Sequence, residues 1–125
     1  MLNNLYFITA ERLATSEGAS PEDESCVTIQ FNPSHPVFAG HFPDHPVVPG
    51  ACLVQIAEEL AGRAAGGPVR FTRLRNLKFR HPVTPDMQVI CTFRELSTFN
   101  FQLSSPTSPC ASFSATYMRV GSDLQ

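Results

Sequence analysis

The sequence predicts an α+β fold, in which one helix packs against a long, curled antiparallel sheet. Two observations support this prediction. Five stretches alternate apolar and polar side chains as strands do, whereas residues 50–65 repeat apolar side chains every three or four residues as a helix does. No helical pattern separates the last four strand-like stretches, so we expect them to be neighbours in the sheet. The 125 residues are the usual size of one domain, and we expect a single domain over residues 1–125.

The first half of the chain supplies a strand, a long loop and the helix. Residues 27–31 predict a half-buried strand, and residues 5–9 offer one further strand before it. Five prolines make residues 32–49 a turn-rich loop. The helix is predicted over residues 50–65, and the sequence Gly66-Gly67-Pro68 provides its stop. Its many apolar positions indicate that it lies in the concave face of the sheet.

The second half of the chain consists of strands. The first of them changes phase between Leu74 and Leu77, which predicts a β-bulge near Asn76. No repeat or low-complexity segment interrupts these strands. The four stretches are residues 71–79, 87–93, 99–103 and 111–117.

Composition excludes several classes of protein. Hydrophobic residues make up 42% and charged residues 16% of the chain, which is ordinary for a globular protein and too apolar for a disordered one. No apolar run is long enough to cross a bilayer, and the N-terminal residues lack the pattern of a signal peptide, so we expect a cytoplasmic protein without membrane insertion. The four cysteines form no Cys-x-x-Cys pair and are expected to be small buried apolar side chains.

The loop before the helix has the features of a reaction site. Prolines at positions 43, 46 and 49 stiffen the loop, and Gly50 turns the backbone into the helix without a side chain over its first N–H groups. Such a helix end can bind an anion or a carbonyl oxygen that gains negative charge. His41, nine residues before Gly50, could take a proton from the carbon next to a thioester carbonyl.

The sequence "HPVFAGHFPDHPVVPG" at residues 35–50, the helix after it, and "LKFRHPVTP" at residues 77–85 resemble the (3R)-hydroxyacyl dehydratases that act on acyl carrier protein (ACP) in fatty acid synthesis. These enzymes have the hotdog fold, and the strand–helix–sheet order extends the resemblance over nearly the whole chain. The Gly-His-Phe-Pro and Pro-Val-x-Pro-Gly sequences at this spacing are a much more specific signal than a lone histidine.

The resemblance implies a homodimer in which two sheets join edge to edge, with each active site at the subunit interface; assembly beyond the dimer stays open. His41 would be the catalytic histidine, and the Gly50 N–H would hold the thioester carbonyl, with Phe42, Pro49 and Ala51 beside the substrate. The acyl chain would lie in a tunnel between the subunits. ACP would bring a 3-hydroxyacyl chain on its phosphopantetheine arm, and a trans-2-enoyl thioester and water would be formed. No cofactor is expected.

The chain departs from the family at the helix acid. The family places Glu or Asp fourteen residues after the histidine, where this chain has Gln55, and an amide can hold a hydroxyl but cannot deliver a proton. Glu59 lies one helical turn further along the same face. Three interpretations follow: Glu59 serves as the acid, His41 alone moves the proton, or the protein binds acyl thioesters without dehydrating them. A second departure, "TPDMQ" at residues 84–88, is expected to alter only a turn.

Other interpretations of these residues stay open. A hotdog thioesterase would use the same helix end while a carboxylate activates water. The polar side of the helix, including Glu58, could be a solvated face on which Glu59 pairs with Arg63. His35, His41 and His45 could suggest a metal site, but neither a cysteine nor a regular helical spacing supports one, and we expect no metal.

Five of the nine basic residues lie between residues 70 and 80, although the net charge of the chain is −2. They could bind an acidic carrier protein or the phosphate of its prosthetic arm, or they could form the polar side of a strand whose other side is core. The sequence places Arg73 with Arg75, and Lys78 with Arg80, on common faces of a strand. The aromatic residues of this stretch are expected in the core, so nucleic-acid binding is not expected.

Overall fold

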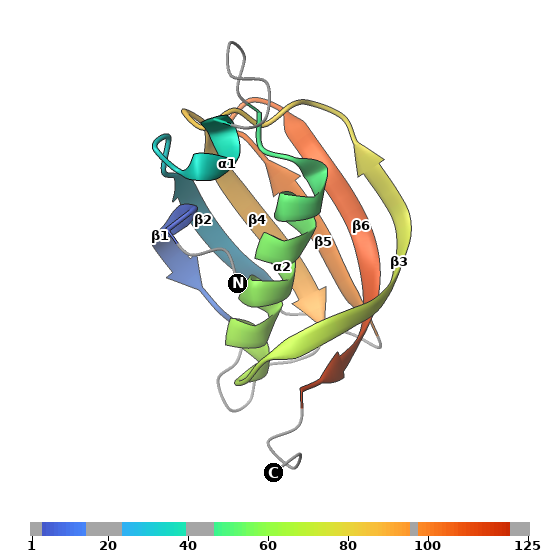
Figure 1. The fold of residues 1–125 in the computed structure, drawn as a ribbon. Coiled ribbons are helices and arrows are strands. Elements are labelled where there is room, and N and C mark those ends of the chain that lie inside the picture. The colour runs from blue at the N-terminus through green and yellow to red at the C-terminus, as the bar shows by residue number, and fades with distance from the viewer. Residues whose placement is uncertain (1–3, 15–23, 40–46, 96–97, 121–125) are drawn as a thin grey trace.

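The computed structural model describes residues 4–14, 24–39, 47–95 and 98–120. In these residues, six strands form one antiparallel sheet, in the order β1-β2-β4-β5-β6-β3, and a long helix lies across one face of it (Figure 1). The predicted α+β architecture is confirmed. The elements are β1 (Tyr6–Arg12), β2 (Ser25–Phe31), α1 (Pro36–Ala39), α2 (Gly50–Ala65), β3 (Val69–Phe79), β4 (Gln88–Glu95), β5 (Phe99–Ser104) and β6 (Pro109–Arg119).

Helix α2 covers the inner, concave face of the sheet, as its apolar spacing predicts (Figure 1). Its apolar stripe is buried, and Ile56, Ala57 and Leu60 have no exposed surface. The helix ends at Gly66, whose φ of 82° is the left-handed conformation that glycine adopts without strain. The N–H of Gly67 then donates to the carbonyl oxygen of Gly62 at 3.0 Å, and the chain turns into β3.

Beneath α2, phenylalanines from neighbouring strands fill the core. Phe101 of β5 lies between Phe93 of β4 and Phe113 of β6, with ring centroids 4.9 Å and 5.1 Å away, and both pairs are stacked. Phe71 of β3 packs against Phe101 at 5.6 Å. Each such pair contributes about 0.5–1.5 kcal/mol beyond the burial of its area. This cluster fixes β3 to the sheet beside α2.

Strand β3 is an edge strand, opposite to β1 in the sheet (Figure 1). Its pairing with β6 shifts register between Phe71 and Arg73 and again between Arg75 and Lys78. Asn76 has a positive φ of 57°, in the second of these shifts, so the predicted bulge is confirmed. Bulges increase the local twist of a strand, and β3 curls around the end of α2 in Figure 1.

Two expectations are changed by the structure. The turn-rich loop contains a short helix, α1, because Pro36 suits the first helical position and the Nδ1 of His35 accepts a hydrogen bond from the Val37 N–H at 3.0 Å. Of the cysteines, Cys91 and Cys110 are buried as expected, whereas Cys26 and Cys52 are only half-buried. No helix in the described ranges is long and apolar enough to cross a membrane.

Candidate functional site

The first turn of α2 presents backbone N–H groups that find no acceptor in the described ranges of the chain. Pro49 is the N-cap, with φ −58° and ψ 144°, and its carbonyl oxygen accepts hydrogen bonds from the N–H groups of Cys52 at 2.9 Å and Leu53 at 3.2 Å. No residue that the structure describes accepts a hydrogen bond from the N–H of Gly50 or Ala51. These two groups, at the positive end of the helix dipole, can therefore receive an oxygen that carries negative charge.

Gly50 lies directly against the ring of Phe79. A Cβ atom built on Gly50 would lie 2.7 Å from the Cζ of Phe79, closer than real Cβ atoms approach other atoms. Phe79 is the last residue of β3, and it is 52% exposed. The absence of a side chain thus allows an exposed aromatic ring to lie against the start of the helix.

A cavity of about 330 Å³ opens at this end of α2. The hydrogen bond from the Val48 N–H to the carbonyl oxygen of Val83, at 2.7 Å, holds the chain beside it just before the helix. Most of its lining is apolar, with Arg80 and His81 as the polar exceptions. The lining residues are Val47, Val48, Gly50, Leu53, Phe79, Arg80, His81, Pro82 and Val83.

The structure brings only part of the predicted site together here. Gly50 lies at the cavity, and Pro49 and Ala51 flank it in the chain. His41 and Phe42 lie outside the described residues, so their roles stay predictions from the sequence. Gln55 and Glu59 line a different cavity, of about 520 Å³, between the second half of α2 and the start of β3.

Helical geometry explains this separation. Each residue turns the helix by about 100°, so Gln55 lies about 140° around α2 from Gly50, and Glu59 about 180°. Gln55 and Glu59 differ from each other by only about 40°. The two side chains therefore share a face, as the sequence predicts, but that face lies on the other side of α2 from Gly50 of the same protomer.

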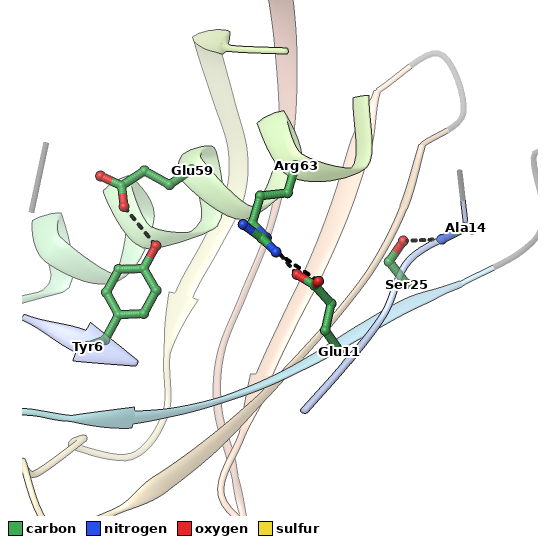
Figure 2. A network of polar contacts seen from close by, with 6 residues as sticks. All are labelled: Tyr6, Glu11, Ala14, Ser25, Glu59 and Arg63. Carbon is green, nitrogen blue, oxygen red and sulfur yellow. Dashed lines mark hydrogen bonds and ion pairs between the residues drawn. The ribbon is translucent and has the colours of Figure 1, made fainter. Parts of the chain in front are cut away.

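Glu59 is held by β1. Its Oε1 accepts a hydrogen bond from the Tyr6 hydroxyl at 2.7 Å (Figure 2). Burial raises the pKa of Tyr6, and the hydrogen bond and charge of Glu59 raise it further, so the phenol stays protonated and remains a donor at neutral pH. A tyrosine from a strand at the far edge of the sheet therefore fixes the position of the carboxylate that is the candidate acid.

Arg63, which the sequence allows to pair with Glu59, forms an ion pair with Glu11 of β1. Arg63 donates two hydrogen bonds to Glu11, from Nε at 2.5 Å and from an Nη at 2.8 Å (Figure 2). The guanidinium group lowers the pKa of Glu11 mainly through the hydrogen bonds, and that carboxylate raises the pKa of Arg63. Sequence spacing within one helix could not reveal this partner, because β1 lies more than fifty residues away.

Glu58 is not the plain surface residue that its place on the polar side of the helix indicates. It is half-buried, and its Oε2 accepts a hydrogen bond from the backbone N–H of Phe71 at 2.7 Å. Phe71 lies at the first register shift of β3, where regular pairing with β6 is interrupted. The carboxylate of Glu58 therefore joins α2 to β3 at this bulge.

Tyr6, Glu11 and Phe79 contact the candidate site residues but are not among the residues predicted from the sequence. Tyr6 and Glu11 lie two and three residues from Ile8 in a weakly patterned strand, and nothing in that pattern names their partners on α2. Phe79 and Leu77 were expected in the core, and this expectation is wrong, because both lie near the end of an edge strand and are 52% and 41% exposed.

Comparison with known proteins identifies relatives of this chain. Residues 17–114 match the family model of the ApeI-like dehydratases. A FabZ 3-hydroxyacyl-ACP dehydratase of Methylobacterium radiotolerans is 42% identical over 78 residues, which are 54% of this chain and 49% of the relative. Another, from a Sulfurovum species, is 36% identical over 98 residues, covering 67% of this chain and 63% of the relative. The chain thus spans half to under two thirds of the length of these curated relatives.

Solved structures confirm the hotdog fold. The ApeI:P dehydratase heterocomplex of Xenorhabdus doucetiae aligns with a TM-score of 0.73 and 18% identity, over 90% of this chain and 97% of that chain. An uncharacterised protein of Erwinia carotovora aligns with a TM-score of 0.79 and 17% identity, over 93% of this chain and 98% of that chain. Escherichia coli PaaI, from the phenylacetic acid degradation operon, aligns with a TM-score of 0.59 and 14% identity, over 93% of this chain and 80% of that chain.

Proposed function

Because the chain belongs to the ApeI-like dehydratase family, we propose that it converts a (3R)-hydroxyacyl thioester on ACP to the trans-2-enoyl thioester and water. The observation that carries this proposal is the start of α2, nine residues after His41, where N–H groups with no acceptor among the residues that the structure describes lie at a cavity. The reaction needs a site for a thioester oxygen that gains charge, and this helix end provides one.

The reaction begins at the carbon between the carbonyl and the hydroxyl-bearing carbon. The Gly50 N–H donates a hydrogen bond to the thioester oxygen, which draws electron density from C2 and acidifies its proton. The imidazole of His41 takes that proton. The electron pair of the broken C2–H bond forms the C2=C3 double bond, and the C3–O bond breaks. The apolar side chains that line the cavity surround this step.

The hydroxyl must gain a proton to leave as water. Gln55 holds the hydroxyl through its amide, and Glu59, held by Tyr6, delivers the proton from its protonated carboxyl form. Before the next turnover the resulting carboxylate takes up a proton, and the imidazolium of His41 loses the proton that it took from C2. Both side chains lie on the other side of their own helix from Gly50, so we assign them to the active site that is completed by the partner protomer. His41 and Gly50 of one protomer then act with Gln55 and Glu59 of the other.

Edge β3 is the surface through which this dimer would form. It is the last strand of the sheet, and Leu77 and Phe79 are 41% and 52% exposed there. An unpaired edge with exposed apolar side chains favours pairing with a second sheet. The 520 Å³ cavity with Gln55 and Glu59 is also lined by Pro68 and Val69, which lead into β3, so it lies beside this edge.

The test is mass spectrometry of ACP loaded with a (3R)-hydroxyacyl chain and incubated with the protein. We expect a product lighter by one water, and we expect His41→Ala to lower the rate by about 10²–10⁴-fold, the usual contribution of a general base. Glu59→Gln keeps the oxygen that accepts from Tyr6 but carries no transferable proton, and it should slow dehydration by a similar factor. Thermal unfolding of each variant controls for loss of folding.

Other outcomes would replace the proposal. If the hydroxyacyl chain stays intact in the presence of folded protein, the protein binds acyl thioesters without turnover. Gln55, which stands where the family has an acid, favours that function. Release of the free hydroxy acid would instead identify a thioesterase. Full activity of Glu59→Gln with loss of activity in His41→Ala would assign both proton transfers to His41.

A further inference from the structure

The outer face of β3 carries a row of cations. Directly paired residues lie on the same face of a sheet, and the apolar residues Phe71, Leu74 and Phe79 pair with inner-face residues of β6. The basic residues of β3 pair instead with Met118 and with three hydroxyl side chains on the outer face of β6. We call these basic residues the β3 cation row: Arg70, Arg73, Arg75 and Lys78.

The two bulges of β3 create this row. In a regular strand, side chains alternate between faces, so Arg70 and Lys78 would lie on the face opposite to Arg73 and Arg75. The register shift between Phe71 and Arg73, and that between Arg75 and Lys78, each reverse the alternation. All four charges therefore point outward, along roughly 25 Å of strand.

No strand places a carboxylate on this outer face. The only acidic residues in the described strands are Glu11 and Glu95. Glu11 faces α2, where it binds Arg63, and Glu95 pairs with the inner-face residue Phe99 and accepts a hydrogen bond from Tyr117. The outer face of the sheet is therefore cationic, although the net charge of the chain is −2.

The charges of the row have no counterion in the described part of the chain. Arg63, Arg94 and Arg119 each form an ion pair with a glutamate, whereas none of the four row residues does. Phe7 of β1 and Met118 of β6 also lie on the outer face, and each is more than half exposed. Unneutralised cations and exposed apolar side chains thus share one surface.

We propose that the β3 cation row binds the surface of an anionic lipid bilayer, so that the protein associates peripherally with a membrane. This inference goes beyond the proposed reaction and uses none of its steps. Anionic headgroups offer negative charge over a wide plane, and each Lys or Arg near such a surface strengthens binding roughly fivefold. Apolar side chains such as Phe7 and Met118 can enter the boundary between headgroups and acyl chains.

The curvature of the sheet suits this partner. Helix α2 covers the concave face, so the outer face is the convex one (Figure 1). A convex face meets a plane at its middle. In the dimer proposed above, the two β3 strands pair, and their rows lie side by side at the middle of the joined outer face. Like charges so placed repel each other, and an anionic surface would remove that repulsion.

Other partners fit the row less well. Single-stranded nucleic acids are bound by cations together with aromatic rings that stack on the bases. The paired neighbours of the row on the outer face are hydroxyl side chains and Met118, and the rings of Phe71 and Phe79 belong to the inner face. A second copy of the same cationic face would be repelled.

The experiment measures how much of the full chain sediments with vesicles of phosphatidylcholine, with and without the anionic lipid phosphatidylglycerol. We expect binding only to the anionic vesicles, and release as salt rises. Arg73→Ala with Arg75→Ala should weaken binding at least about tenfold, because two charges of the row are lost. The control, Arg12→Ala with Arg94→Ala, removes equal charge from β1 and β4, outside the row, and should weaken it less than about threefold.

Three results would overturn the proposal, once thermal unfolding shows that each variant is folded. If the wild type does not sediment with anionic vesicles, the row is only a solvated strand face. If both double variants weaken binding equally, net charge and not the row governs it. If a single-stranded RNA or an acyl carrier protein binds the row more tightly and releases the protein from the vesicles, the partner is a different one. The vesicles carry no thioester, so none of these results depends on dehydratase activity.

Discussion

The two ends of α2 differ in how they meet the rest of the molecule. At the start, the backbone N–H groups of Gly50 and Ala51 donate to no acceptor among the described residues, and they lie beside an exposed ring. Further along, three charged side chains each bind another element: Glu58 binds β3, and Glu59 and Arg63 bind β1. The first end leaves donors available to a ligand, and the second uses polar groups to fix the helix on its sheet. A polar helix face is therefore not by itself a reaction site.

Glu59 both attaches α2 to the sheet and takes part in the proposed reaction. Its bond to Tyr6 contributes to the attachment of α2, and the same bond fixes the carboxylate at the cavity where the proposed reaction needs an acid. Glu58, one residue earlier, attaches the helix without being assigned to the reaction. Comparison of these two glutamates separates attachment from chemistry.

The largest effect on stability is expected for Glu58→Ala. The substitution leaves the Phe71 N–H, which is partly buried, without its acceptor, and it should lower the free energy of unfolding by about 1–2 kcal/mol. Urea denaturation measures this change. Glu58→Gln retains an acceptor oxygen and serves as the control, with a smaller loss. If Glu58→Ala were as stable as the wild type, the bulge would not depend on this carboxylate.

Gly50→Ala tests the opposite end of the helix. The new methyl group must displace the Phe79 ring, which can move because it is half exposed, so we expect little change in stability. We expect kcat/KM to fall about tenfold, or about 1.4 kcal/mol, because the displaced ring changes the cavity beside the Gly50 N–H. Adding Phe79→Ala should restore part of the activity if the clash is the cause. Undiminished activity of Gly50→Ala would separate this helix end from the reaction.

The smallest effect is expected for the ion pair between Arg63 and Glu11. Their side chains are 49% and 25% exposed, so solvent screens the pair, and Glu11→Gln should cost less than about 1 kcal/mol at neutral pH. The pKa of Glu11 is lowered in the folded state, so its contribution is present above the usual glutamate pKa of about 4.3 and is lost as the pH falls through the lower, folded value.

Urea denaturation of Glu11→Gln and the wild type, at neutral and at acidic pH, measures this difference. The two proteins should differ at neutral pH and converge in acid. A difference that persists at low pH would show that the lost interaction is packing of the side chain rather than charge.

Local spacing was enough to predict most of the fold. The period of two in the strands and the three- and four-residue spacing of α2 gave their order, and the phase slip around Asn76 gave the bulge. These features were accessible because each depends on residues close together in the chain. The motif around His41 is equally local, and it was enough to indicate the family.

The tertiary structure decided which distant residues meet. Tyr6 and Glu11 reach α2 only because β1 curls beside it, and no spacing within the helix could reveal them as partners of Glu59 and Arg63. Likewise, sequence alternation grouped Arg73 with Arg75 and Lys78 with Arg80, whereas the register shifts of β3 bring Arg70, Arg73, Arg75 and Lys78 to one face. The physical reason is the same in both cases. The spacing of apolar residues describes a single helix or strand, but pairing between elements sets the direction in which each side chain points.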